Sequence, residues 1–179
     1  VDIVHKNKTF VQNFMTNRLG MIGFYGVTFI ALLGIFAFVI APYPKGYGPD
    51  LVLPPSGTYW FGTDNLGLNV FAEVVWGART SLYVSVIAVA VAAIIGIPAG
   101  LISGYRKGTL GAIIDATIDI FLTLPVLPLM IVIAAIVGSS IVNVAVVIGI
   151  FSWPSLARVT RNSTLKVSEM QYIEAAKCL

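Results

Sequence analysis

Two aspartates are the residues of this sequence whose type and spacing could do chemistry. Asp115 and Asp119 lie four residues apart, so they would share one face of a helix. In an apolar environment such carboxylates are costly unless they are paired or hydrated. One interpretation is a proton relay, and the other is a position at the membrane interface near Arg106 and Lys107. The interface position is favoured, because a relay would place its acids near the midplane of the bilayer.

The other reactive side chains are too few for catalysis or metal binding. The chain has one histidine, His5, in its polar N-terminal tail, and one cysteine, Cys178. Neither a catalytic triad nor a metal site can be assembled from them. The sequence also lacks a glycine-rich loop of the Walker type, so any ATP would have to be bound by a partner. We therefore predict a chain that is not an enzyme and that holds no cofactor or metal.

The composition indicates that the solvent of this protein is lipid. Hydrophobic residues make up 58% of the chain and charged residues 11%, and the mean hydropathy is +0.92. An ordinary soluble domain is about one-quarter charged. The eleven Lys and Arg residues are scattered, with no basic face interleaved with aromatic residues. This pattern excludes a nucleic-acid partner and favours a role of these residues in membrane topology.

Long uncharged runs indicate the membrane-spanning helices. The run at residues 20–41 is followed by Pro42, which cannot continue helical hydrogen bonding. The stretch from Ile120 to Ala157 carries no charge and is too long for one crossing, so two spans must share it, with a break near Gly138. We predict an all-α polytopic transmembrane helical bundle with four spans, at residues 20–41, 80–105, 112–137 and 141–157. The polar segments between and around them are a tail at 1–19, a loop at 42–79 and a helix-prone segment at 158–179.

The basic residues predict the orientation of the chain. Cytoplasmic segments carry an excess of Lys and Arg. If the N-terminus is cytoplasmic, all eleven basic residues except Lys45 and Arg79 lie inside. The tail and the 158–179 segment are then cytoplasmic, and the 42–79 loop is external. We expect a multi-pass protein of the cell (inner or plasma) membrane.

Prolines and small residues indicate irregular or close-packed places in the spans. We expect a kink near Pro98 and a kinked or broken helix at Pro125 and Pro128, because each proline removes a backbone donor. A broken helix either lines a translocation path or is a static bend of the bundle. Gly100 and Gly104 have the spacing that permits close helix packing. Trp153 is ambiguous, and interfacial anchoring is the usual role of tryptophan.

Motifs in the loop and the last three spans carry a family resemblance. Residues 61–67 read Phe-Gly-Thr-Asp-Asn-Leu-Gly and residues 77–82 read Gly-Ala-Arg-Thr-Ser-Leu. This pattern resembles the signature of the dipeptide/oligopeptide/nickel permease family, in particular its C-type subunits. Further family patterns are similar to residues 119–125 and to the Trp153-Pro154 pair with the residues after it. Residues 172–179 resemble the opening of the family's EAA motif. The signature residues are Gly62, Thr63, Asp64, Gly67, Gly77, Arg79 and Ser81.

The resemblance implies a type I ABC importer permease fold of about six spans, with this chain ending inside the EAA motif. It implies a path for peptides or a related small solute, which opens by alternating access. The implied partners are a second homologous permease, two cytoplasmic ATPases that bind ATP and Mg²⁺, and an extracytoplasmic substrate-binding protein. The EAA loop of such permeases docks on the ATPase, and the implied coupling residues are Arg158, Arg161, Glu174, Ala175 and Ala176. The polar, helix-prone composition agrees with a docking helix and equally with a solvated helix at the membrane surface.

The chain departs from the family pattern at two places. The family continues after Gly67 with Arg and Asp, where this chain has Leu68 and Asn69. It also carries Arg at the position of Ala116, which leaves Asp119 without that neighbour. The alternative from another class is an ion-coupled secondary carrier or channel that uses Asp115 and Asp119 and works without ATPases.

Overall fold

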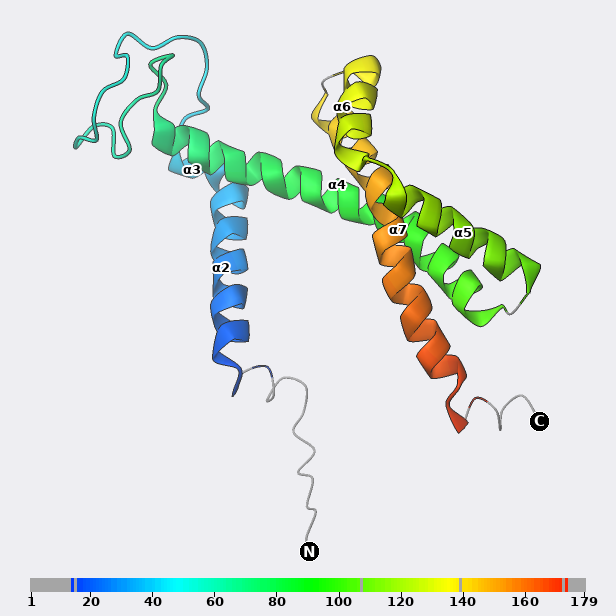
Figure 1. Cartoon of the computed structure of the whole chain (residues 1–179). Helices are drawn as coiled ribbons and strands as arrows, with labels where there is room; N and C mark the ends of the chain where they lie inside the picture. The colour runs from blue at the N-terminus through cyan, green and yellow to red at the C-terminus, as the bar shows by residue number, and fades with distance from the viewer. Residues whose placement is uncertain (1–13, 15, 107, 139, 172, 174–179) are drawn as a thin grey trace, which may run out of the picture. The chain divides into compact units, whose positions relative to one another are not determined.

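The computed structural model describes residues 14, 16–106, 108–138, 140–171 and 173, and this part of the chain is helical (Figure 1). Its only β feature is an isolated antiparallel bridge between Thr63 and Asn69. The described chain divides into two compact units, and the boundary falls between Leu82 and Tyr83, inside the longest helix. The helices are α2 (Arg18–Ile35), α3 (Ala37–Ile40), α4 (Val70–Tyr105), α5 (Thr109–Thr123), α6 (Val126–Val137) and α7 (Ile141–Ser168).

Four membrane spans are compatible with the described helices. By length and apolar composition, α2, α4 and α7 could each cross a bilayer. α5 and α6 pass the same test only as a pair, and they are bent by 86° at the break between them. The all-α, polytopic architecture predicted from the sequence is therefore confirmed.

The first unit packs α2 and α3 against the start of α4. Asn17 caps α2 by accepting a hydrogen bond from the Gly20 amide at 3.2 Å. Gly34 permits the close approach, because a Cβ there would lie 3.1 Å from the backbone of Arg79. Small buried residues continue this contact, and the Trp76 indole donates to the Ala41 carbonyl at 3.1 Å. The buried residues are Ala37, Ala41, Ala72 and Val75.

The loop before α4 is shorter than the sequence suggested. We expected it to continue to Arg79, but the helix begins at Val70. The reason is a side-chain cap: Asn69 Oδ1 accepts from the Phe71 amide at 3.0 Å, and the Asn69 carbonyl accepts from the Glu73 amide. α4 then continues through Pro98 without interruption to Tyr105, so the expected kink does not break the helix.

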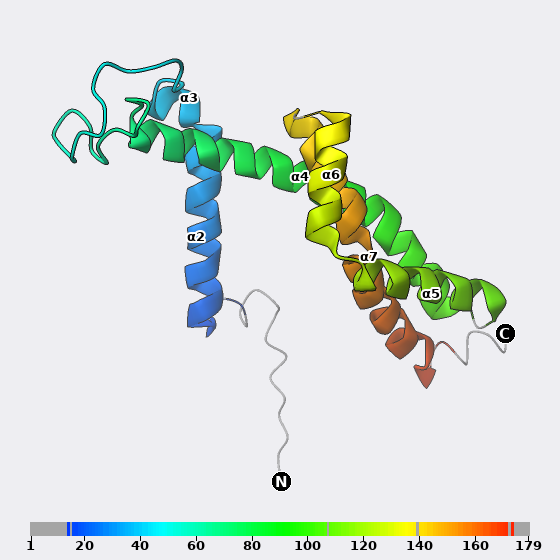
Figure 2. The same ribbon diagram turned by 45° about the horizontal axis from the view of Figure 1, so that its top comes forward.

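The second unit is organised by a stripe of glycines on α4. A Cβ at Gly96, Gly100 or Gly104 would lie within 3 Å of atoms of α7. The facing atoms advance from Trp153 to Thr164 as the glycines advance along α4, so the two helices are parallel. The prediction that Gly100 and Gly104 serve close packing is confirmed. Figures 1 and 2 show α6 beside the first half of α7, and α5 crossing α7 farther along.

The core of this unit forms where α4, α5 and α7 meet. Ile118 of α5 is fully buried, and it clusters with Ala92 of α4 and Ala157 of α7. Trp153 belongs to the same cluster, is only 8% exposed, and lies edge-to-face with Phe121 at 5.5 Å. Trp153, whose role the sequence left ambiguous, thus fills space between α5 and α7.

The predicted break in the third apolar stretch is present, but only one of the two prolines makes it. α5 ends at Thr123, Leu124 is extended, and α6 begins at Val126 directly after Pro125. Pro128 lies in the first turn of α6, where backbone amides have no helical acceptor to lose. The expectation that Pro128 also distorts the helix is therefore wrong. α7 likewise runs past the predicted end at Ala157 and stops at Ser168.

Gly100→Ala tests the glycine stripe. The new methyl would lie 2.5 Å from the Ala157 carbonyl oxygen and 2.6 Å from Thr160 Cβ, so α7 must shift. We expect a loss of about 1–3 kcal/mol of stability, seen as a lower unfolding midpoint of the detergent-purified whole protein. The control is Gly26→Ala in α2, which meets nothing within 4 Å. It should be neutral or stabilising by up to about 1 kcal/mol. Equal effects of the two substitutions would contradict the close approach.

Candidate functional site

The family-signature residues of the loop form its hydrogen-bonding centre. The Thr63 hydroxyl donates to the Asp50 carbonyl at 2.7 Å and accepts from the Leu53 amide at 2.8 Å. The Thr63 amide also donates to the Leu53 carbonyl at 3.1 Å, and the side chain is buried. Thr63 therefore ties two distant stretches of the loop together.

Asp64 organises the turn that follows. Its Oδ1 accepts from the amides of Leu66 and Leu68 at 2.9 and 2.7 Å. The Gly62 and Gly67 residues on either side have φ of +75°, which favours glycine. A Cβ at Gly67 would also lie 2.4 Å from the Gly48 carbonyl oxygen. Residues 62–67 thus build a fixed turn rather than a group of free reactive side chains.

The departure after Gly67 leaves this turn intact. Asp64 binds the backbone amide of Leu68, which any side chain provides. Asn69 acts through its side-chain oxygen as a helix cap, and Asp serves equally well as a cap. The difference from the family pattern therefore changes charge without removing a hydrogen bond of the turn.

Tyr59 and Asp50 add a titratable pair to the loop. The Tyr59 hydroxyl donates to Asp50 Oδ2 at 3.1 Å. This hydrogen bond and the negative charge of Asp50 raise the pKa of the Tyr59 phenol above its ordinary value. The phenol therefore stays protonated at neutral pH and acts as a hydrogen-bond donor.

The second half of the signature lies within α4. Arg79 is exposed, and its guanidinium lies 5.4 Å from the centre of the Trp76 ring. A Cβ at Gly77 would meet nothing within 4 Å, and Ser81 is exposed. These residues share no contact with the turn centred on Thr63 and Asp64 in the described chain, so the structure does not bring the whole signature into one site.

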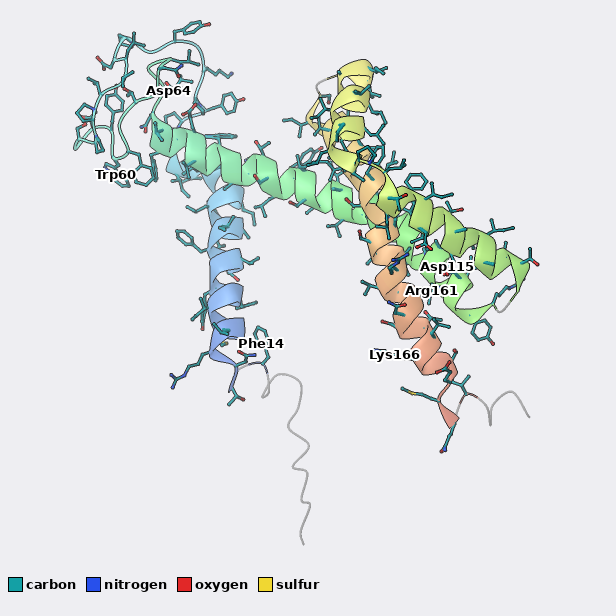
Figure 3. The ribbon with its side chains drawn as sticks, in the orientation of Figure 1. Phe14, Trp60, Asp64, Asp115, Arg161 and Lys166 are labelled. Atoms are coloured by element: carbon teal, nitrogen blue, oxygen red, sulfur yellow. The ribbon has the colours of Figure 1, made fainter. Side chains whose placement is uncertain are left out.

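The two aspartates singled out first are ion-paired to arginines of α7. Asp115 Oδ2 lies 2.8 Å from a terminal guanidinium nitrogen of Arg161 (Figure 3). Asp119 pairs with Arg158. The inner pair, Asp115 with Arg161, is about 30% exposed, whereas the outer pair is about half exposed. α5 and α7 are therefore antiparallel at this contact, with acids on one helix and bases on the other.

This pairing corrects the expected neighbours of the acids. Arg106 and Lys107 precede α5 in sequence, but the observed partners are Arg158 and Arg161. The family carries an arginine at the position of Ala116, and in this chain Arg158 supplies a positive charge beside Asp119 instead. The role predicted for the two arginines in ATPase coupling remains a prediction, and both already have a partner within the chain.

An open, apolar groove of about 310 Å³ lies between the ends of α4 and α7. Its walls include Leu101, Tyr105, Val167 and Ile173. The hydroxyls of Thr160, Ser163, Thr164 and Ser168 also line it, and each donates to a carbonyl of its own helix. Within the described ranges, no group of three or more His, Cys, Asp or Glu side chains could hold a metal ion. His5, Cys178, Glu174, Ala175 and Ala176 lie outside the described residues.

Comparisons with known proteins match both ends of the chain. A family described as the N-terminal TM domain of oligopeptide transport permease C matches residues 8–55. A second family, described as the binding-protein-dependent transport system inner membrane component, matches residues 96–179. Residues 96–179 thus belong to this permease family. The turn centred on Thr63 and Asp64 lies between the two matched segments.

Curated relatives are permeases of peptide transport systems. The chain is 36% identical over 163 residues to the dipeptide transport system permease of Alkalihalophilus pseudofirmus, covering 90% of this chain and 54% of the relative. It is 31% identical over 176 residues to the oligopeptide transport system permease of Bacillus subtilis, covering 96% and 57%. It is 35% identical over 173 residues to the glutathione transport system permease of Escherichia coli, covering 95% and 57%. The chain spans about half the length of these permeases.

Thr63→Ala tests the hydrogen-bonding centre of the loop. Loss of the hydroxyl leaves the Leu53 amide and the Asp50 carbonyl without this partner, which costs about 1–3 kcal/mol. We expect faster protease cleavage between residues 45 and 62, measured on the purified whole protein. Thr63→Ser keeps the hydroxyl and should cleave at nearly the original rate. Equal cleavage of all three proteins would show that the hydroxyl does not hold the loop.

Removing one charge from each ion pair tests the contact between α5 and α7. Asp115→Asn leaves Arg161 without its partner at a site that is mostly buried, and we expect a loss of about 1–3 kcal/mol. Asp119→Asn should cost at most about 1 kcal/mol, because that pair is half exposed. Unfolding midpoints of the purified whole protein measure both losses.

The exchanged pair, Asp115→Arg with Arg161→Asp, is the control for this test. It restores opposite charges across the contact and should recover at least half of the stability that Asp115→Asn loses. A double variant no more stable than a protein carrying Asp115→Arg alone would mean that the two side chains do not interact.

Proposed function

We propose that the whole protein is a permease subunit of an ATP-driven importer of peptides or a related small solute. The observation that carries this proposal is the continuous likeness to peptide-system permeases over 90% or more of the chain. The membrane-compatible helices and the close α4–α7 packing agree with it. With a second permease, this subunit would form the path for the solute.

The proposed partners follow from the permease family. They are a second homologous permease, two cytoplasmic ATPases that bind ATP and Mg²⁺, and an extracytoplasmic substrate-binding protein. This chain would carry out no covalent chemistry, since ATP hydrolysis would take place on the ATPases. Solute transfer would then occur by alternating access, which requires that ATP-driven movement reach the membrane helices.

The orientation we propose has the N-terminus in the cytoplasm. α4 and α7 are parallel and α5 is antiparallel to α7, so the C-terminal ends of α4 and α7 share one side with the start of α5. Arg106 and Lys166 lie at these ends, and a concentration of basic residues favours the cytoplasmic side. The segment that follows α7 would then face the ATPases, and the 42–69 loop would face the external binding protein.

We assign coupling to the segment that follows α7. Glu174, Ala175 and Ala176 would dock on the ATPase, with the small side chains permitting close approach and Glu174 pairing with a basic residue. Arg158 and Arg161 would contribute by fixing α7 to α5. Movement of the docked segment would therefore reach the break between α5 and α6 at Pro125, which we propose lies near the solute path.

The carrier alternative has less support. A proton-coupled carrier would need Asp115 or Asp119 available to bind and release protons. Each carboxylate is instead paired with an arginine of α7, an arrangement that serves helix packing. The family match also joins this chain to transport systems that depend on a binding protein.

Glu174→Arg in the whole protein tests the coupling proposal. Reversing the charge should prevent docking, so we expect at least a tenfold loss of ATPase subunits recovered with the permease, together with loss of peptide uptake. The measurements are co-purification and uptake of a labelled dipeptide by cells. Glu169→Arg, the same change outside the EAA-like stretch, should retain both. The proposal fails if Glu174→Arg leaves assembly and uptake unaffected, or if the two variants lose them equally.

A further inference from the structure

Two aromatic side chains of the loop stay exposed although they are packed on the start of a membrane helix. Trp60 is 65% exposed and Phe61 is 53% exposed. The ring centres of Trp60 and Phe61 lie 5.1 and 5.7 Å from that of Phe71, in the first turn of α4. Within the described chain, no acceptor binds the Trp60 indole N–H. The pair thus presents apolar rings and one free polar edge outward.

The loop holds these rings in place. The Gly62 amide donates to the Tyr59 carbonyl at 3.0 Å, and the Val70 amide donates to the Gly62 carbonyl at 3.2 Å. The buried Thr63 follows directly and is bound on both sides. The backbone on either side of Trp60 and Phe61 is therefore fixed by hydrogen bonds, and Phe71 supports both rings.

The length and charge pattern of α4 indicate that its first turns extend beyond the hydrocarbon core. α4 has 36 residues, about 54 Å at the rise of an α-helix, whereas the hydrocarbon core is about 30 Å thick. Glu73 and Arg79 lie in the first turns, and no charged residue follows before Arg106. The hydrocarbon core is therefore expected to begin near Arg79, and Phe71 lies on its water side, about 12 Å before Arg79 along the helix axis.

Other side chains of the first unit agree with this depth. Tyr43, just after α3, lies edge-to-face with Trp76 at 4.7 Å, and Lys45 lies 5.5 Å from the centre of the Tyr43 ring. Rings with polar edges and a nearby lysine are typical of the membrane–water interface. In Figure 3, Trp60 lies lower in the view than Asp64, on the side of the loop nearer α3.

We propose that Trp60 and Phe61 insert into the headgroup region of the bilayer and anchor the loop on the lipid surface. The partner is a zwitterionic phospholipid interface, since the 42–69 loop carries only Lys45, Asp50 and Asp64 and offers no basic cluster for anionic lipid. The rings supply apolar contact, and the free indole N–H donates to headgroup or water oxygens. This surface requires a membrane protein, but it does not depend on which solute is transported or on ATP.

The test is quenching of Trp60 fluorescence by labelled lipid. The whole transport complex is reconstituted in phosphatidylcholine vesicles, once with the original chain and once with Trp60→Phe, and the difference in emission isolates Trp60. We expect this difference to be quenched at least twofold more strongly by lipid labelled near the headgroup than by lipid labelled at the chain end. Aqueous iodide should quench it weakly.

Two other outcomes would overturn the proposal. Strong quenching by iodide without quenching by lipid would place Trp60 in water. Resistance to both quenchers would mean that a protein subunit covers it. Trp60→Phe keeps an aromatic ring on Phe71, and an unchanged unfolding midpoint of the variant confirms that the loop still folds. Peptide uptake measured on the same vesicles tests the proposed transport function separately. The lipid-anchoring proposal and the transport proposal can therefore fail independently.

Discussion

The close approach of α4 and α7 is the constraint on which the second unit depends. Lipid tails are as apolar as the helix surfaces, so burial of apolar area does little to join helices in a membrane, and close packing must supply the attraction. Gly96, Gly100 and Gly104 remove the side chains that would keep the backbones apart. Gly149 does the same from α7, where a Cβ would lie 2.6 Å from Val91 Cβ. With α7 held this closely, Ile118 and Trp153 can fill the space beside it.

This packing also determines what the charged side chains can do. Once α7 is fixed on α4, its arginines face α5, and Asp115 and Asp119 find partners there. Ion pairs of this kind reduce the cost of charge at membrane depth and set the register of the two helices. The same arginines lie in the helix that leads to the EAA-like segment. Under the coupling that we propose, this fixed connection would pass movement of that segment to the membrane helices.

The sequence predicts this architecture unevenly, and the reasons are physical. Uncharged runs and Pro42 locate membrane helices because lipid penalises charge wherever the helix sits. The break at Pro125 follows from local backbone chemistry in the same way. The partner of Asp115 could not be predicted in this way. Arg161 lies more than forty residues later in the sequence, and the pairing depends on which helix faces pack together. The role of Trp153 stayed ambiguous for the same reason.

The remaining errors arise where position within an element decides the effect of a residue. Pro128 distorts a helix interior but is harmless in a first turn, and the sequence does not show where α6 begins. Asn69 was placed inside the predicted 42–79 loop, and only the hydrogen bond that its side chain accepts from the Phe71 amide identifies it as the cap of α4. Residues 61–67 were singled out by family resemblance, but the turn that they form, the burial of Thr63 and its two hydrogen bonds required the structure.

Energy coupling is the property that separates a subunit of an ATP-driven importer from a carrier that works alone. It is measured most directly as dipeptide uptake into vesicles that contain the purified whole complex. Uptake is compared with and without ATP, and with and without a proton gradient across the vesicle membrane. The account predicts that uptake requires ATP on the ATPase side and the substrate-binding protein on the other, and that dissipating the proton gradient has no effect. Uptake that proceeds without ATP and follows an imposed proton gradient would contradict it.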